Sequence, residues 1–223
     1  MQSFEAIYAL AAARKGGASK LESLLSRPVA PEQLAKTGDD RWLSAMARGI
    51  FQAGFSWRVI ETKWPGFEQA FDGFDPARVA FYGDAGVDRL LADKRIVRNG
   101  QKVMAVLDNA AFLCALAEEH GTAAQCFAHW PDVDLAGLLQ LMKTRGSRLG
   151  GNTGQRVLRA MGRDTYVMTP DVTARLAAEG VIDGPVTSKR AMAAIQHAFN
   201  TWAGQSGRSF CEISQVLAYS IDH

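Results

Sequence analysis

The sequence has few cysteines, no long apolar run and no excess of charge of either sign. Its three cysteines, Cys114, Cys126 and Cys211, lie far apart in the 223-residue chain. They do not form a disulfide framework, and they indicate reduced thiols in an intracellular compartment. Lys and Arg total 25 against 23 Asp and Glu, so the net charge of +2 neither requires nor excludes a nucleic-acid partner.

No stretch approaches the roughly 18 consecutive apolar residues of a membrane span. The most apolar segment, residues 103–117, is interrupted by Asp108 and Asn109. At the N-terminus the basic pair Arg14-Lys15 follows the apolar part, whereas a secretory signal has the opposite order. We therefore expect no membrane attachment and a cytoplasmic protein, associated with the nucleoid if its partner is DNA.

Apolar residues recur at three- and four-residue spacing along most of the chain, and no alternating strand pattern is present. The sequence therefore predicts an all-α fold of about ten or eleven helices. We expect one domain over residues 1–223, with two helical lobes and a cleft between them, and no boundary sharper than Pro131-Asp132. The expected helices cover residues 4–15, 39–53, 56–64, 76–80, 84–91, 99–120, 134–145, 153–161, 171–179, 188–203 and 209–221.

Residues 145–154 form a glycine-rich segment between two of these helices. Gly150 and Gly151 permit a tight turn, and Asn152 or Thr153 can cap the following helix. Backbone N–H groups at such a helix start are a natural phosphate site. Between residues 143 and 163 there are six basic side chains and no acidic one: Lys143, Arg145, Arg148, Arg156, Arg159 and Arg163. This predicts a local positive field that can hold a polyanion, or else a helix–helix turn with a solvated basic face.

The pattern Leu149-x-Gly151-x-x-Gly154, with a helix on each side, resembles the helix-hairpin-helix element of the DNA glycosylase superfamily. The resemblance places the hairpin at about residues 134–162 and implies a duplex DNA partner, bound through its backbone without sequence specificity. The implied DNA-binding residues are Gly150, Gly151, Asn152, Thr153, Gly154, Arg148 and Arg156.

Asp171 follows Gly151 by twenty positions, within Thr169-Pro170-Asp171. In the superfamily an aspartate at about this distance faces the flipped nucleotide, so the resemblance implies that Asp171 is catalytic. An aspartate before an apolar helix is also an ordinary N-cap, worth about 1 kcal/mol. The two roles are compatible, because a cap holds the carboxylate rigidly.

A second block of motifs runs from Arg41 to Ala111 and includes Phe51 to Trp57, Phe74-Asp75-Pro76 and Asn109-Ala110. Its order and spacing resemble those of the 3-methyladenine DNA glycosylase I family. The resemblance implies a base pocket with a stacking tryptophan, since a flipped base needs a flat apolar surface. The implied pocket residues are Trp57, Phe51, Gln52 and Gly49. Trp57 could instead be a core residue of an amphipathic helix.

The chain departs from that family at three places. The family glutamate that reads the alkylated base stands eight residues before the tryptophan, and that position is Gly49 here. The N-terminal aromatic–His–Asp segment and the paired Cys/His zinc ligands are also absent, so we expect no metal and no cofactor. The segment after the hairpin resembles the aspartate branch of the superfamily more than the end of glycosylase I.

These patterns together predict a DNA-repair N-glycosylase that excises alkylated bases such as 3-methyladenine from duplex DNA. The alternative is a non-catalytic protein that binds DNA lesions or structures on the same fold. A third possibility is a helical protein whose basic strip binds RNA or an acidic protein. The sequence leaves the oligomeric state open, with a monomer as the expectation, and it assigns no role to residues 1–40.

Overall fold

The chain folds into helices and connecting turns in this computed structural model, which describes residues 1–222. No strand occurs among these residues, so the predicted all-α class is confirmed. The described part has fourteen α-helices and two 3₁₀ helices, more than the ten or so that the periodicity predicts. The additional ones include α2 (Ala18–Glu22), α3 (Pro31–Leu34) and α9 (Ala123–His129), which are too short to show a repeating apolar pattern.

The described residues divide into two compact units, each with its own core. Unit 1 comprises Met1–Val29, Pro131–Gly137 and residues 162–222. Unit 2 comprises Ala30–Trp130 and Leu138–Met161. In the described part of the chain no helix is both long enough and apolar enough to cross a bilayer.

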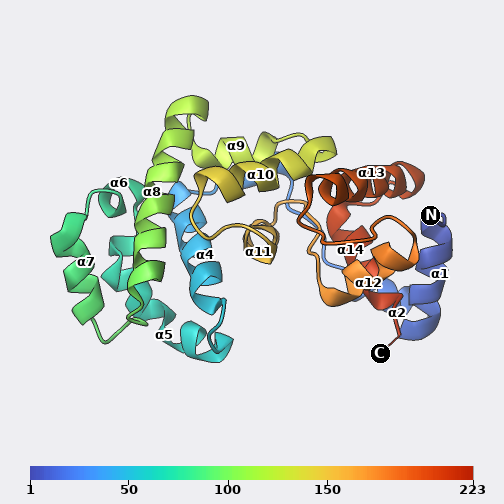
Figure 1. The fold of residues 1–223 in the computed structure, drawn as a ribbon, viewed down its shortest axis with the longest axis horizontal. Coiled ribbons are helices and arrows are strands. Elements are labelled where there is room, and N and C mark those ends of the chain that lie inside the picture. The colour runs from blue at the N-terminus through green and yellow to red at the C-terminus, as the bar shows by residue number, and fades with distance from the viewer. Residues whose placement is uncertain (223) are drawn as a thin grey trace. The chain divides into compact units, whose positions relative to one another are not determined.

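Unit 2 is built around two adjacent helices, α4 (Asp39–Gln52) and α8 (Gly100–His120), which Figure 1 shows in cyan and green. Around them lie α5 (Trp57–Ala70), η1 (Asp72–Phe74), α6 (Pro76–Val79) and α7 (Gly83–Ala92). The second helix of the predicted hairpin, α11 (Asn152–Met161), packs on α4. A row of stacked aromatic rings, with centroids 5.0–6.3 Å apart, fills the core between α4 and α5: Trp64, Phe67, Phe71 and Phe74.

Helix α5 extends further than predicted. Trp64-Pro65 is a helix-stop signal, yet the helix continues to Ala70. A proline inside a helix removes one backbone hydrogen bond and costs about 3 kcal/mol. Trp64 and Phe67 lie on either side of Pro65 and are both buried in the aromatic core, which offsets this cost. The continuation carries Glu68 into the unit, and this residue becomes important at the site.

The helix caps follow the sequence at most positions. Asn99 accepts a hydrogen bond from the Lys102 N–H at the start of α8, and Asp75 accepts from the Ala77 and Arg78 N–H groups at the start of α6. At α4 the N-cap is Gly38, and no side chain caps the helix start. Asp39 instead accepts from the first two N–H groups of α9 and ties that helix to α4.

Unit 1 is centred on α14 (Phe210–Tyr219), which packs against α1 (Phe4–Lys15), α12 (Pro170–Ala178) and α13 (Lys189–Ser206). The chain enters α12 through an extended segment, residues 163–168, most of which is buried. Asp164 in this segment accepts hydrogen bonds from the Phe210 and Cys211 N–H groups at the start of α14. Burial raises the pKa of the Asp164 carboxyl group.

Candidate functional site

The hairpin loop has the backbone geometry that its glycines predict. α10 (Leu135–Arg145) and α11 enclose residues 146–151. Gly151 has φ +57°, a left-handed conformation that favours glycine. Gly154 is buried, and a Cβ atom there would lie 2.4 Å from the Leu149 carbonyl oxygen. Its N–H donates to that same oxygen. Both glycines are therefore needed for the backbone to turn and approach itself this closely.

Asn109 fixes this loop to the rest of unit 2. Its side chain is fully buried on α8. Its amide nitrogen donates to the Ser147 carbonyl oxygen at 2.9 Å, and its amide oxygen accepts from the Ser147 N–H at 2.8 Å. The Asn109-Ala110 motif and the glycine-rich segment, separate in the sequence, are thus parts of one structure.

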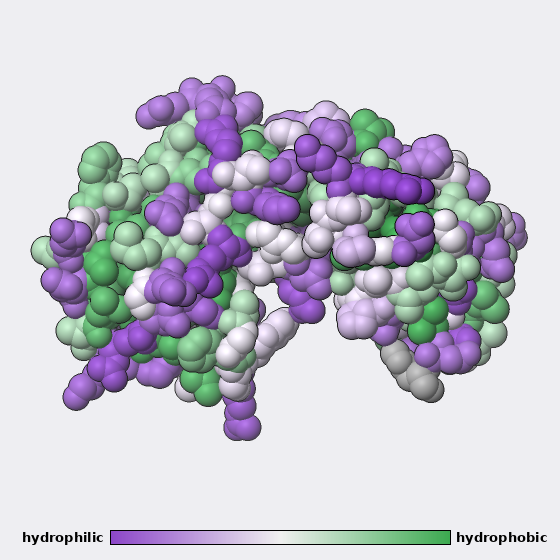
Figure 2. All heavy atoms as spheres, in the orientation of Figure 1, coloured by the Kyte–Doolittle hydropathy of each residue, from purple (hydrophilic) through white to green (hydrophobic). Residues whose placement is uncertain are grey.

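The positive field around the hairpin is smaller than the sequence predicts. Arg145 is paired with both carboxylate oxygens of Glu119, at 2.9 and 2.6 Å. Arg163 is buried in unit 1 and pairs with Asp132, so it does not belong to the hairpin surface. Arg148 and Arg156 remain exposed, together with Lys143. Figure 2 shows hydrophilic side chains gathered over α8 and the hairpin loop.

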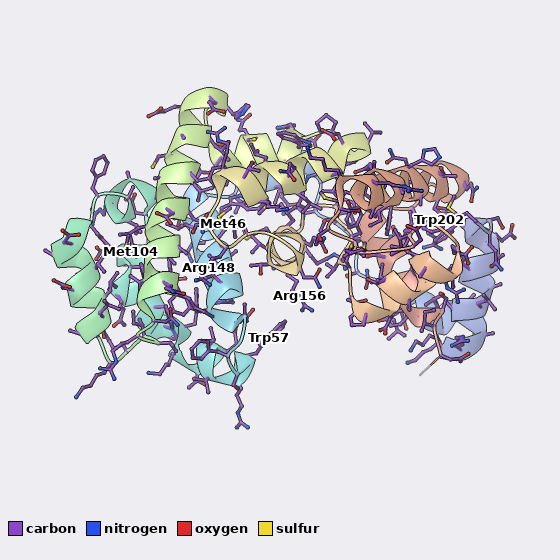
Figure 3. All side chains as sticks on the ribbon, viewed as in Figure 1. Met46, Trp57, Met104, Arg148, Arg156 and Trp202 are labelled. Carbon is purple, nitrogen blue, oxygen red and sulfur yellow. The ribbon has the colours of Figure 1, made fainter. Side chains whose placement is uncertain are left out.

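Arg148 links the hairpin loop to the start of α8. It has φ +59°, which is uncommon for a residue with a side chain, and its guanidinium donates to Gln101 at 2.7 Å. The backbone strain is stored in the loop whose amides would face a phosphate. Figure 3 shows the Arg148 side chain on this face of unit 2.

A groove of about 270 Å³ lies beside α4 in unit 2. Two predicted pocket residues, Gly49 and Gln52, and the predicted DNA-binding residue Arg156 line it. The other lining residues come from α4, α5 and α11: Arg41, Ser44, Ala45, Arg48, Glu68, Val157, Ala160 and Met161.

Gly49 allows close packing of α11 on α4. A Cβ atom at Gly49 would lie 3.0 Å from the Val157 Cγ2 atom and 3.5 Å from the Thr153 Cγ2 atom. Side chains of α11 thus occupy the space that a glutamate at this position would need. The departure from the family pattern is therefore accommodated by helix packing.

Glu68 supplies a carboxylate that sequence reasoning missed. It lines the same groove from α5, nineteen positions after Gly49 in the sequence. Arg41 donates to its two oxygens at 3.0 Å each, Ser44 Oγ donates at 2.7 Å, and Trp64 Nε1 donates at 3.0 Å. Burial raises the pKa of the Glu68 carboxyl, but the hydrogen bonds from Arg41 and Ser44 outweigh it and hold the pKa below its usual range. Sequence reasoning missed Glu68 because Trp64-Pro65 predicts the end of the helix, whereas α5 continues and carries Glu68 to the groove.

Trp57 stands at the start of α5 with 52% of its surface exposed, so it is not a core residue. The Arg156 guanidinium lies 5.3 Å from its ring centroid. Figure 3 shows the two side chains pointing toward one another. Phe51, by contrast, has no exposed surface and packs edge-on against Phe67 at 4.7 Å. Trp57 can therefore offer a stacking face to a ligand, while Phe51 supports the core beneath the motif.

Lys102, on α8, binds the C-terminal end of α4. Its ammonium group donates to the carbonyl oxygens of Ile50, Phe51 and Ala53, and it lies 4.5 Å from the Phe55 ring centroid. Burial, with the nearby charge of Arg148, lowers the pKa of Lys102. All three ammonium hydrogens have backbone acceptors, so this lysine caps α4.

Asp171 lies in unit 1, whereas Trp57 and the hairpin loop lie in unit 2. The prediction that Asp171 is the N-cap is wrong. Thr169 is the N-cap of α12 and accepts from the Val172 N–H at 3.2 Å, Pro170 follows, and Asp171 is in the first turn. Its carboxylate is partly exposed. Because Thr169 holds the helix start, the Asp171 charge can be changed without removing the cap.

The cysteines and histidines form no apparent metal centre in the part of the chain that is described. No group of three or more His, Cys, Asp or Glu side chains there could hold a metal ion. Cys114, Cys126 and Cys211 form no disulfide within residues 1–222, and burial raises the pKa of Cys114 and Cys126.

Comparison with known proteins places this geometry in a family context. The family model for methyladenine glycosylases matches residues 34–137. DNA-3-methyladenine glycosylase 1 of Escherichia coli (strain K12) is 37% identical over 59 residues, which are 26% of this chain. That alignment spans only about a third of the curated relative (32%).

Solved structures show the same fold. A 3-methyladenine DNA glycosylase I in complex with 3-methyladenine matches with a TM-score of 0.51 at 23% identity, over 59% of this chain and 82% of that chain. The 3-methyladenine DNA glycosylase I of Staphylococcus aureus matches with a TM-score of 0.52 at 22% identity, over 62% and 80%. The predicted resemblance is confirmed: residues 34–137 are similar to the methyladenine glycosylases, and the chain has the fold of 3-methyladenine DNA glycosylase I.

Proposed function

We propose that this protein is a DNA-repair N-glycosylase that excises alkylated bases, of the class that includes 3-methyladenine, from duplex DNA. The observation that carries the proposal is the grouping in unit 2 of a helix-hairpin-helix loop, an exposed tryptophan and a groove. The match of residues 34–137 to the methyladenine glycosylases supports it. The substrate is chromosomal DNA in the cytoplasm, bound without sequence specificity.

The hairpin loop would hold the duplex through its phosphates. Gly150, Gly151, Asn152, Thr153 and Gly154 form the turn and the start of α11, where backbone N–H groups and the helix dipole favour an anion. Arg148 and Arg156 add two exposed positive charges beside it. None of these groups reads a base, so binding follows the shape and charge of the backbone.

The flipped base would stack on Trp57 and enter the groove past Gly49 and Gln52. Taking a base out of the duplex costs a few kcal/mol, and least for a damaged base. Stacking on an aromatic ring returns about 1–3 kcal/mol. Phe51 acts indirectly in this arrangement, as the buried support of the motif.

Asp171 would act on the sugar. As the glycosidic bond breaks, positive charge develops at C1′, and a fixed carboxylate stabilises it or positions the attacking water. No lysine stands next to Asp171 in the sequence, which favours simple hydrolysis over strand cleavage through a covalent amine intermediate.

One observation favours the alternative, a non-catalytic lesion-binding protein on the same fold. The position of the family glutamate is Gly49, covered by Val157 and Thr153, and the carboxylate nearest to it in the groove, Glu68, is held by Arg41. A protein that only binds damaged DNA does not need a free carboxylate there.

A two-part experiment separates these functions. Base release is measured on a panel of duplexes with alkylated, deaminated or mismatched bases, by cleavage of the resulting abasic sites. Duplex affinity is measured against salt concentration. If four to six phosphates are neutralised, log K should fall against log salt with a slope of about −4 to −5. Base release supports the glycosylase. Salt-dependent binding without release supports the binding protein, and absence of duplex binding at low salt contradicts both.

A further inference from the structure

The groove beside α4 has an excess of positive charge, whereas a cationic methylated base requires a negatively charged partner. Three arginines and one glutamate line it: Arg41, Arg48, Arg156 and Glu68. Arg41 holds Glu68 through two parallel hydrogen bonds of 3.0 Å, so these two charges cancel. Arg156 keeps its charge without an ion pair among the described residues, and Arg48 has only a long ion pair, with Glu61 outside the groove lining.

Arg48 keeps hydrogen-bonding capacity. Its guanidinium lies 4.5 Å from the Trp64 ring centroid, and its ion pair with Glu61 is long, at 3.6 Å. The buried Nε–H of Arg48 has no hydrogen-bond partner within residues 1–222. Glu61 is not among the groove-lining residues, and one of its oxygens already accepts from Gln52 at 2.9 Å.

Arg156 stands where a base would stack. Its guanidinium faces the exposed ring of Trp57 at 5.3 Å, and it forms no ion pair with any residue that the structure describes. A base that stacks on Trp57 comes into direct contact with this guanidinium. A positively charged base is repelled there, whereas an uncharged base with ring nitrogen or carbonyl acceptors can receive its hydrogen bonds.

The missing glutamate cannot be replaced by a small side-chain rearrangement. A side chain at position 49 would press on Val157, and Glu68 is committed to three donor side chains. The groove therefore offers donors and positive charge but no free carboxylate to neutralise a cation.

We propose that this groove selects uncharged alkylated bases that present hydrogen-bond acceptors, such as etheno adducts, and disfavours cationic methylpurines. The inference rests on the proposed function and narrows its substrate class. Arg48 and Arg156 are the specificity-determining residues, because both line the groove and contribute its donors and positive charge, and Arg156 also faces the Trp57 ring.

The chemistry of the leaving group is consistent with this selection. Hydrolysis breaks the C1′–N bond, leaves its electron pair on the base, adds the hydroxyl of water to C1′ and releases one proton. An uncharged base takes up this proton, whereas the proton goes to solvent when the base is cationic. A cationic base departs neutral and needs no help. An uncharged base departs with developing negative charge, which guanidinium donors stabilise.

The test compares duplexes that are identical except for one base, 1,N6-ethenoadenine or the cationic 7-methylguanine. Single-turnover base release and duplex affinity are both measured, and each is expressed as the ethenoadenine-to-methylguanine ratio. We expect a ratio of at least about ten in the wild-type protein, and a decrease of at least about threefold in Arg48→Gln and in Arg156→Gln.

Arg58→Gln is the matched control. Arg58 is exposed on the same unit but does not line the groove, so its loss weakens binding to both duplexes equally and leaves the ratio unchanged. Circular dichroism checks that each variant folds. Arg156 is exposed, so its variant retains the fold even if Arg48→Gln does not.

The inference is overturned if the ethenoadenine-to-methylguanine ratio of the wild-type protein is near or below one, or if Arg156→Gln does not change this ratio. Base release from either duplex still supports the glycosylase proposal in that case. If neither duplex releases a base, nor any other of the panel, the glycosylase proposal fails. The affinity ratio then still decides the inference: preference for the ethenoadenine duplex supports it, and equal or reversed preference overturns it.

Discussion

Asn109 and Ser147 exchange two hydrogen bonds between a buried side chain and a loop backbone, across 38 positions of the sequence. The amide of Asn109 thus completes the hydrogen bonding of a loop residue that lies in neither hairpin helix. Through Asn109, helix α8 fixes the position of the hairpin loop, residues 146–151, which is the proposed DNA-binding element.

The first prediction follows from this pair. Asn109→Ala leaves the Ser147 N–H and carbonyl without their partners and creates a small cavity, so it should lower the free energy of unfolding by about 2–3 kcal/mol. Urea unfolding measures the loss, and duplex affinity should fall with it. Asn200→Ala is the control: it removes an exposed hydrogen bond to the Val133 carbonyl and a partly buried one from Gln196, leaves no fully buried group unpaired, and should cost clearly less than Asn109→Ala. Equal losses of unfolding free energy and of duplex affinity in the two variants would show that Asn109 does not hold the hairpin loop.

The hairpin glycines give the second prediction. Gly151→Val places a branched side chain at φ +57°, and Gly154→Val forces a Cβ atom against the Leu149 carbonyl. Each should weaken duplex binding at least about tenfold and cost about 1–3 kcal/mol of stability while the helical fold is retained. Fluorescence anisotropy and thermal unfolding measure the two effects. Gly204→Ala is the control, because nothing lies within 4 Å of that position. It should stabilise α13 by up to about 1 kcal/mol, without changing affinity.

The third prediction concerns the pH dependence of Glu68. Its pKa lies below the ordinary value of 4.5, so its carboxylate stabilises the folded protein fully above pH 4.5 and loses this effect as the pH falls through the lowered value. Glu68→Gln should cost about 1–2 kcal/mol near neutral pH. The difference from wild type should shrink in acid. Unfolding at a series of pH values measures it, with the exposed Glu118→Gln as control. A difference that persists unchanged below the lowered pKa would show that the ion pair with Arg41 is not its source.

The fourth prediction separates charge from capping at the start of α12. Asp171→Asn keeps the Thr169 cap, so stability should change by less than about 1 kcal/mol. Base release should slow at least about a hundredfold if Asp171 acts as proposed, because the carboxylate that would stabilise the sugar cation is lost. Thr169→Ala should show the reverse: a stability loss of about 1 kcal/mol with little change in the rate of release. An unchanged rate in Asp171→Asn would remove this residue from the mechanism.

Much of the fold could be predicted from the sequence because its signals are local. The caps at Asn99, Asp75, Ser188 and Ser209 mark helix starts through short side-chain hydrogen bonds, and the structure has helices there. The hairpin could be placed because Gly151 and Gly154 meet backbone requirements that few other residues satisfy. Position 49 was also identified by counting along one motif.

The chemistry of the groove could not be predicted in this way, because it depends on contacts between distant segments. Pro65 indicated a helix stop, but burial of Trp64 and Phe67 carried α5 onward and brought Glu68 to Arg41. The sequence places Arg145 in a basic strip, but in the structure Glu119, from α8, neutralises its charge.

The sequence by itself determined the all-α class, the capped helix starts at Asn99, Asp75, Ser188 and Ser209, and the hairpin turn, since each depends on residues within a few positions of one another. Only the tertiary structure decided which groove arginines are neutralised by a carboxylate and how little room α11 leaves for a side chain at position 49. Helix packing brings Val157 against Gly49 from 108 positions away along the chain, and Arg156 against Trp57 from 99 positions away. Coulomb and packing energies depend on distance in space, and spacing along the chain does not record that distance.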